Sequence, residues 1–479
     1  MKAPLDWNHA ATSPSIDIAV SKSLPAGSHG TRLIMGNPGG PGAPGLGMAP
    51  MLAAQWGARD DLAVGFDVRG TGASANLSCE GAPAFTGDVR NTRQSAYDKV
   101  AAVAKAQQAA CRKASGALLD YVTTDQTVKD MNLIRAFLRY PTTDYVGYSG
   151  GTWLGAYYQK YFPTHVGRFV LDSNADFTKP WNITFGAQPQ SFQRRFVKDF
   201  QPWAATYGDL FQLGSTPAAV NAFYEKLRRD LVRKPLVISE GGQTLTIDGN
   251  TFDNAIVGTL YSKTYFPLLA VFLRIVRDEW DDSQEGGRVT LPADVAALVH
   301  KTSQVDGANR PLSVDAFPST FTAITCNDWA WPGKQPFADA RTRQLGAAYP
   351  LVGYSYNRNA CFYWKRPPVT LQVPDGKGIG TTLMVQSEHD PATNASLAID
   401  AHAHYPGSVL IYVKKEGDHG IYASGNKCVD TKVNRFLATG VAPDGDKTCF
   451  GLPLPDPTKR SETVSIQEQL DAWTALIHF

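Results

Sequence analysis

The amino-acid sequence predicts an α/β fold in which a mostly parallel β-sheet is covered by helices and carries a large, mainly helical insertion. Between residues 30 and 175, short apolar runs alternate with longer stretches of helical periodicity. This alternation is typical of parallel strands joined by crossover helices. From residue 177 to residue 377 the chain is instead rich in aromatic residues and mostly helical in pattern, and strand-like runs return after residue 380.

Composition excludes several classes of protein. The chain has 479 residues, of which 43% are hydrophobic and 19% are charged, so it can bury a large core. Its formal net charge is +2 and it has no long basic run, which argues against nucleic acid or an anionic membrane as a partner. The longest apolar stretch, residues 265–276, is too short to span a bilayer. We expect a monomer without cofactors.

The six cysteines indicate disulfide bonds. None lies in a C-x-x-C motif or at zinc spacing from histidine, so we expect no metal site. They fall into three sequence-local pairs: Cys79–Cys111, Cys326–Cys361 and Cys428–Cys449. An even number of cysteines favours an exported protein, and the alternative is six free buried thiols in a cytosolic one. No signal peptide precedes Leu5, so we expect the leader to be absent from this chain.

The first strands are expected near the N-terminus. Apolar residues 16, 18 and 20 share one face, and a second run at 32–35 follows a turn, which predicts an opening hairpin or meander. Residues 36–42, Gly-Asn-Pro-Gly-Gly-Pro-Gly, come directly after that run. They predict a rigid loop whose bare backbone N–H groups can approach a substrate carbonyl, although a simple surface turn is the alternative.

The next segments repeat this layout. A strand at 62–66 leads into a glycine-rich loop, in which we expect Asp67 and Arg69 to pair with each other in a structural role. Apolar periodicity predicts helices at about 95–115 and 127–140.

A nucleophile motif follows the second of these helices. A short strand at 145–146 ends in Gly147-Tyr148-Ser149-Gly150-Gly151, and a helical pattern runs on to residue 161. Strand, tight turn and helix form the context that a G-x-S-x-G nucleophile elbow requires. A side chain at Gly147 or Gly151 would collide with the neighbouring strand or helix. The motif also occurs by chance, so the rest of the chain has to supply the partners of Ser149.

The remaining elements complete the predicted domain organisation. Residues 1–176 form the first part of the catalytic domain, 177–377 form a cap, and 378–479 form the second part with a C-terminal extension. The many aromatic residues of the cap are expected either to line a substrate pocket or to fill the cap's own core. Strands are predicted at 381–386 and 408–413.

Partners for Ser149 come from the loops that follow these two strands. A serine hydroxyl needs an imidazole as base and a carboxylate that fixes the imidazole tautomer. Ser149, Asp390 and His419 have the chain order Ser, Asp, His, and each follows a predicted strand, so they share one edge of the sheet. Asp172 and Asp176 are rival acids. The rival histidines are His165, His300, His389, His402, His404 and His478.

An oxyanion hole completes the hypothesis. Two backbone N–H groups are expected to form it: that of Gly150, directly after the nucleophile, and that of Gly40 in the glycine-rich loop.

Several motifs together resemble one family. They are Leu5-Asp6-Trp7, Asn37-Pro38-Gly39-Gly40-Pro41-Gly42, Asp67-x-Arg69-Gly70-x-Gly72-x-Ser74, Gly147-Tyr148-Ser149-Gly150-Gly151, Asp390-Pro391-x-Thr393 and Gly417-Asp418-His419-Gly420. To about residue 450 the chain resembles the secreted bacterial tripeptidyl aminopeptidases, serine peptidases of the α/β-hydrolase fold related to proline iminopeptidases. Pro38 stands where proline iminopeptidases have histidine, which favours the tripeptidyl branch.

The resemblance implies an α/β-hydrolase fold with a large cap and a secreted exopeptidase. Peptide or protein N-termini would enter under the cap, and an N-terminal tripeptide would leave through an acyl-enzyme. The resemblance leaves open whether proline precedes the cleaved bond and whether tetrapeptides are released as well. Asp328 is a candidate anchor for the substrate amine, and its alternative is a surface acid beside a disulfide.

The sequence leaves other functions open. A carboxylesterase or lipase would use the same three residues, and a binding protein on a hydrolase scaffold would not need them intact. A metallohydrolase is disfavoured because no H-E-x-x-H motif is present.

Overall fold

The computed structural model describes residues 1–240, 243–284 and 313–459. Its centre is an eight-stranded sheet of order β12-β11-β10-β7-β6-β4-β5-β3, in which only the edge strand β3 is antiparallel to its neighbour. The α/β class expected from the sequence is therefore confirmed. The strands are β3 (Val20–Ser23), β4 (Arg32–Asn37), β5 (Asp61–Phe66), β6 (Thr143–Tyr148), β7 (Val166–Asp172), β10 (Thr382–Ser387), β11 (Ser408–Lys414) and β12 (Lys447–Phe450).

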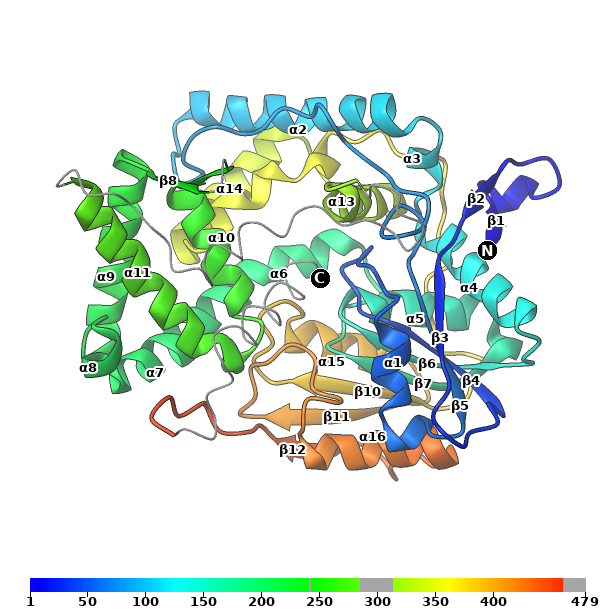
Figure 1. Ribbon diagram of the computed structural model, residues 1–479. Helices are drawn as coiled ribbons and strands as arrows, with labels where there is room; N and C mark the ends of the chain where they lie inside the picture. The colour runs from blue at the N-terminus through cyan, green and yellow to red at the C-terminus, as the bar shows by residue number, and fades with distance from the viewer. Residues whose placement is uncertain (241–242, 285–312, 460–479) are drawn as a thin grey trace.

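Helices cover both faces of this sheet (Figure 1). One face packs against α4 (Thr124–Phe137), α5 (Gly150–Tyr161) and α15 (Ala395–Ala403), and the other against α1 (Met48–Ala53) and α16 (Lys427–Thr439). Successive residues of a strand serve opposite faces: Met35 belongs to the first cluster and Ile34 to the second. Two buried faces explain why the central strands carry apolar residues on both faces.

The short elements near the N-terminus correct one prediction. β1 (Lys2–Pro4) and β2 (Ser15–Asp17) form a separate antiparallel pair. β3 pairs with β5, and β5 lies between β3 and β4, so the predicted opening hairpin of residues 14–20 with 32–35 is wrong. The reason is burial: β4 is buried along nearly its whole length and takes a central parallel position, whereas β3 is partly exposed and suits an edge.

The remaining short elements are η1 (Trp7–His9), η2 (Trp56–Ala58), α3 (Leu118–Tyr121) and η3 (Pro163–His165). β12 was not predicted. It extends the sheet beside β11, and the Cys428–Cys449 disulfide ties it to α16.

The insertion forms a cap with its own hydrophobic core. Phe196, Phe200, Leu231, Phe252 and Leu273 are buried in that core, so many of the cap's aromatic rings stabilise the cap itself. A short hairpin of β8 and β9 accompanies the helices. The cap elements are α6 (Trp181–Arg194), the π-helical η4 (Arg195–Phe200), α7 (Gln201–Thr206), α8 (Gly208–Phe211), α9 (Pro217–Arg233), β8 (Leu236–Glu240), β9 (Gln243–Ile247), α10 (Gly249–Thr259), η5 (Lys263–Tyr265), α11 (Phe266–Gln284), α13 (Ala316–Asp328), α14 (Gln335–Ala348), η6 (Gly353–Arg358) and η7 (Ala360–Phe362). The predicted boundaries at 177 and 377 stay a prediction.

Helix α2 (Gln94–Ser115) packs against the second half of the cap rather than against the sheet. It lies beside α14 and α13 in Figure 1, and its Cys111 shares a buried cluster with Cys326 and Cys361. Two disulfides, Cys79–Cys111 and Cys326–Cys361, lie in this cluster. All three predicted cysteine pairs are therefore present.

Asp67 and Arg69 are structural, but they do not pair with each other. The Arg69 guanidinium is fully buried and donates two hydrogen bonds of 2.7 Å to Asp130. Asp67 accepts hydrogen bonds from the backbone N–H groups of Gly45, Leu46 and Ala73. The two side chains thus hold different loops in place, because each finds a partner that the local sequence does not show.

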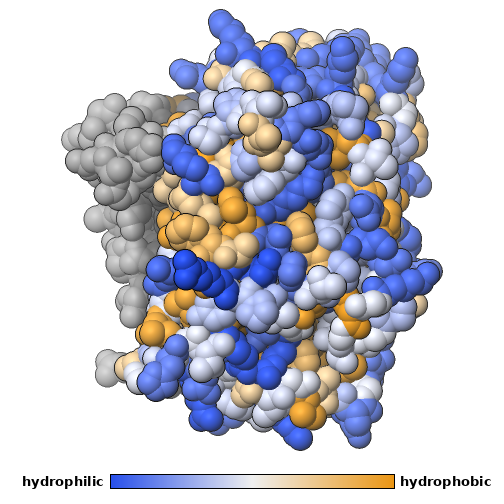
Figure 2. All heavy atoms as spheres, turned by 90° about the vertical axis from the view of Figure 1, so that its right-hand side faces the viewer, coloured by the Kyte–Doolittle hydropathy of each residue, from blue (hydrophilic) through white to orange (hydrophobic). Residues whose placement is uncertain are grey.

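The surface has a mixed character on the face that Figure 2 shows, which is the right-hand side of Figure 1, where β1, β2 and α4 lie. Hydrophobic residues are scattered there singly or in small groups among hydrophilic ones. Within the described ranges, no helix has the length and apolar character needed to cross a membrane. The apolar stretch at 265–276 belongs to α11 of the cap, where Phe266, Leu269 and Leu273 are buried.

Two buried carboxylates meet near the start of the central strands. Arg32 donates to Asp61 at 2.7 Å and lies 3.5 Å from Asp144. One oxygen of each carboxylate is buried without a hydrogen-bond partner among the described residues. Burial, together with the negative charge of Asp61, raises the pKa of Asp144 to about 8.

Because of the raised pKa of Asp144, we expect the free energy of unfolding to fall as the pH rises. Folded Asp144 keeps a proton that the unfolded chain releases above about pH 4, so its contribution to stability declines until the pH passes about 8. The free energy of unfolding of Asp144→Asn, relative to that of the unsubstituted protein, should therefore rise by roughly 2–4 kcal/mol when the pH is raised from 5 to 8. Denaturant unfolding at both pH values measures this. The exposed Asp281→Asn serves as control, and an equal effect of Asp144→Asn at both pH values would contradict the prediction.

Candidate active site

The nucleophile motif forms the turn between β6 and α5. Ser149 lies between them with φ 53° and ψ −123°, a strained conformation for a residue with a side chain. A Cβ atom at Gly147 would lie 2.4 Å from the carbonyl oxygen of Gly151, and one at Gly151 would lie 2.6 Å from that of Asn37. Glycine is thus required at both positions, and the tight turn places Ser149 in the wall of a pocket.

The predicted acid and base are in direct contact. Nδ1 of His419 lies 2.9 Å from each carboxylate oxygen of Asp390. Asp390 is 1% exposed, and its Oδ1 also accepts hydrogen bonds from the backbone N–H groups of Ala392 and Thr393. The turn after β10 therefore fixes the carboxylate, and the carboxylate fixes the imidazole.

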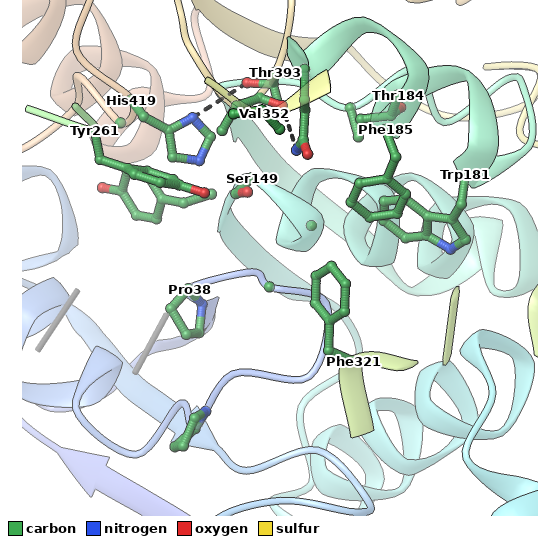
Figure 3. Close-up of a pocket in the computed structure, with 18 of the residues that line it drawn as sticks. Pro38, Ser149, Trp181, Thr184, Phe185, Tyr261, Phe321, Val352, Thr393 and His419 are labelled. Atoms are coloured by element: carbon green, nitrogen blue, oxygen red, sulfur yellow. Dashed lines mark hydrogen bonds between the residues drawn. The ribbon is translucent and has the colours of Figure 1, made fainter. Parts of the chain in front are cut away.

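Ser149 and His419 line the same pocket. In Figure 3 one ring nitrogen of His419 is directed toward Ser149, while Nδ1, the atom that contacts Asp390, lies on the side of Thr393. A proton on Nδ1 that faces Asp390 leaves Nε2 free to accept one. The structure thus brings together the three side chains that the sequence singled out from the ends of three different strands.

The rival acids have other partners. Asp172 is fully buried and accepts hydrogen bonds from the backbone N–H groups of Ile421 and Tyr422, so it shapes the turn after His419. Burial raises the pKa of Asp172 to about 6. Asp176 bonds to Thr178 and lies 3.4 Å from the ammonium group of Lys179.

The rival histidines do not line the pocket, as far as the structure describes them. His389 lies near Glu388. His165 contacts Pro141, His402 contacts Ser408, and His404 contacts Asp400. His300 and His478 lie outside the described residues.

The two expected oxyanion donors lie in the same pocket. Strand register places Asn37 of β4 beside Gly147 of β6, so the glycine-rich loop after β4 lies against the nucleophile turn. Gly40 and Gly150 both line the pocket, and Figure 3 shows Pro38 of this loop near Ser149. Neither Gly40 N–H nor Gly150 N–H donates a hydrogen bond to any described residue. As far as the described residues show, both donors are therefore unused within the chain.

The cap holds the loop that carries His419, a feature that sequence reasoning missed. The His419 N–H donates to the carbonyl oxygen of Tyr261 at 2.8 Å. Asp418 accepts hydrogen bonds from the Arg195 guanidinium and from the backbone N–H of Lys263. The Lys263 ammonium also binds Glu416 at 2.6 Å. The acidic residues on either side of Gly417 are the one feature of the sequence that indicates such contacts. Their partners lie more than a hundred residues earlier in the chain.

Comparisons with known proteins agree with this site. The profile of the family described as TAP-like protein matches residues 349–449. The chain is 31% identical over 459 residues to the tripeptidyl aminopeptidase of Streptomyces lividans, covering 90% of this chain and 80% of that protein. The chain belongs to the tripeptidyl aminopeptidase family. It is therefore a serine peptidase of the α/β-hydrolase type.

More distant relatives cover a similar share of the chain. Serine protease Hip1 of Mycobacterium tuberculosis (strain H37Rv) is 26% identical over 488 residues, covering 94% of this chain and 86% of that protein. A protein named carboxylesterase B from the same organism is 27% identical over 471 residues, covering 94% of this chain and 85% of that protein.

The pocket of this family member lies between the sheet and the cap and has a volume of about 840 Å³. Its wall is mostly apolar, with aromatic rings from Trp181, Phe185 and Phe321 facing the cavity (Figure 3). Among the described lining residues there is no carboxylate, and the side chains that can carry a positive charge are His419 and Arg358. The described residues also include no group of His, Cys, Asp or Glu that could hold a metal ion.

Asp328 does not line this pocket, so its prediction as the amine anchor is wrong. Its side chain is 2% exposed, and its oxygens accept hydrogen bonds from Thr124 at 2.9 and 2.6 Å and from Trp181 at 3.3 Å. Burial raises the pKa of Asp328 to about 7. Asp328 instead joins the end of α13 to the first turn of α4, where the helix dipole favours a carboxylate.

Proposed function

We propose that Ser149, Asp390 and His419 form a catalytic triad and that the protein releases N-terminal tripeptides through an acyl-enzyme. The observation that carries this proposal is the double 2.9 Å contact between His419 and Asp390, beside Ser149 in one pocket. Membership in the tripeptidyl aminopeptidase family supports the tripeptide as product.

The proposed reaction is an acyl transfer through Ser149. The Ser149 hydroxyl attacks the peptide carbonyl carbon while its proton passes to Nε2 of His419, and Asp390 stabilises the imidazolium that results. The oxyanion accepts hydrogen bonds from the N–H groups of Gly40 and Gly150. His419 then gives the proton to the leaving amine, and the C–N bond breaks. Water, activated by the same imidazole, hydrolyses the ester and restores Ser149.

The cap sets how much peptide lies on the acyl side of the cleaved bond. A pocket of about 840 Å³ with apolar walls suits a few extended residues, including proline. The substrate's α-ammonium group must find acceptors at the far end. Among the described lining residues these are neutral, such as the side-chain amides of Gln188 and Asn254.

A substrate panel tests this function. It compares tripeptide p-nitroanilides with a free amine, their N-acetylated forms, and p-nitrophenyl esters of short acids. We expect turnover of the free tripeptides and slower turnover of the acetylated ones. Equal turnover of the two would refute an aminopeptidase. In addition, mass spectrometry of a digested peptide library should show N-terminal fragments of three residues. The same spectra would reveal any release of tetrapeptides.

Carboxylesterase activity is the second candidate, because the carboxylesterase B relative is 27% identical over nearly the whole chain. Turnover of the esters alone in the same panel would establish it in place of the peptidase.

We also propose that the protein works outside the cytosol as a monomer. The three disulfides support an oxidising compartment. Mass spectrometry of protein from its native host should find no free thiols, and light scattering should give the mass of one chain. Six free thiols would contradict the location outside the cytosol, and the mass of a dimer would contradict the monomer.

A further inference from the structure

Arg358 is an unusual residue in the pocket wall. It is the last residue of η6 in the cap, and it is the one permanently charged side chain among the described residues that line the cavity. No Asp or Glu of the described chain lines the same cavity. The neighbouring groups partly desolvate the guanidinium, and a charged partner would offset that cost.

The guanidinium of Arg358 is accessible although protein surrounds it. The residue is exposed to solvent, yet desolvation by neighbouring groups lowers its pKa. Such a combination is expected of a side chain that projects into a concave site.

Its contacts within the described chain are weak. The guanidinium carbon lies 5.6 Å from the centre of the Phe85 ring, and the charge of Asp248 acts on it from a distance. Asp248 is already engaged as the N-cap of α10, where it accepts hydrogen bonds from Asn250 and Thr251. Arg358 forms no hydrogen bond or ion pair with a described residue. Within the described ranges, therefore, no acceptor takes up its five N–H donors.

We propose that Arg358 binds a carboxylate group of the peptide substrate and so makes the enzyme selective for peptides that carry a negative charge away from the cleaved bond. The planar fork of a guanidinium binds a carboxylate through two parallel hydrogen bonds. The carboxylate can be an acidic side chain or the free C-terminus of a short peptide. This inference rests on the proposed function, because it takes the pocket to be the peptide site.

The test measures binding separately from turnover. In the Ser149→Ala background, calorimetry compares peptides that differ in one charge: Glu against Gln at each position, and a C-terminal acid against its amide. We expect at least one carboxylate peptide to bind about 10- to 100-fold more tightly than its neutral partner. The position of that carboxylate identifies its source.

Substitutions then assign the preference to Arg358. Arg358→Gln, made in the same background, should abolish the preference, and Arg358→Lys should retain part of it. Arg229→Gln, on the exposed side of α9, is the matched control and should leave it unchanged. A wild-type site without preference for any carboxylate peptide, or a preference that survives Arg358→Gln, would overturn the inference.

The outcome is distinguishable from failure of the proposed function. If the protein with Ser149 intact turns over no peptide while the carboxylate preference is present, the proposed reaction fails and the binding site stands. If peptides are turned over but charge makes no difference, the reaction stands and the role of Arg358 is refuted.

Discussion

Replacing Ser149 with alanine should lower kcat for a tripeptide p-nitroanilide by roughly 10⁴- to 10⁶-fold. The hydroxyl is the only group that the proposal places in covalent contact with the substrate carbonyl, so its loss stops acylation. Alanine also suits the tight turn sterically, because it keeps the Cβ atom and removes only Oγ. The variant should therefore fold normally.

Two measurements check this prediction. Steady-state kinetics give kcat, and a fluorophosphonate probe should label the unsubstituted protein but not Ser149→Ala. Ser355→Ala is the matched control, because Ser355 lines the same pocket and has no part in the proposed chemistry. Its activity should stay within a few-fold of the original. Probe labelling that persists without Ser149 would move the nucleophile to another residue.

Asp390→Asn should lower kcat by about 10⁴-fold with little change in the fold. An asparagine oxygen can still accept the hydrogen bonds from Ala392 and Thr393. Its amide N–H groups would face Nδ1 of His419, however, and favour the tautomer that carries the proton on Nε2. That tautomer cannot accept the proton of Ser149, so the base is lost although the geometry is kept.

Asp176→Asn provides the comparison for this variant. Asp176 is a buried acid that follows β7, and its partners are Thr178 and Lys179 rather than His419. We expect its kcat to change only a few-fold. A loss as large as that of Asp390→Asn would reassign the acid, and unchanged kcat in Asp390→Asn would remove that residue from the triad.

Much of the fold could be predicted because local patterns report it directly. The buried strands β4, β5, β6, β10 and β11 each contain a short apolar run, and α2, α4 and α5 follow helical periodicity. The opening hairpin was mispredicted because strand pairing depends on burial across the whole sheet, which local alternation does not show. β12 was missed because its four residues carry no apolar run, and its place depends on β11 and on the disulfide to α16.

The candidate site shows the same division. Ser149, Asp390 and His419 could be found because each follows a strand of a parallel sheet, and such strands end at one edge. Asp328 was wrongly placed because an acid in a helical cap can face the pocket or the neighbouring α4, and only packing decides between them.

By itself, then, the sequence determined the parallel sheet, the nucleophile turn and the identity of the three residues at its edge, since periodicity, glycine spacing and chain order are local properties. Tertiary structure alone decided how the cap holds the His419 loop through Arg195 and Lys263, and that Arg358 faces the pocket while Asp328 does not. Ion pairs and cavity walls join segments far apart in the chain, and their energies depend on burial that no local pattern records.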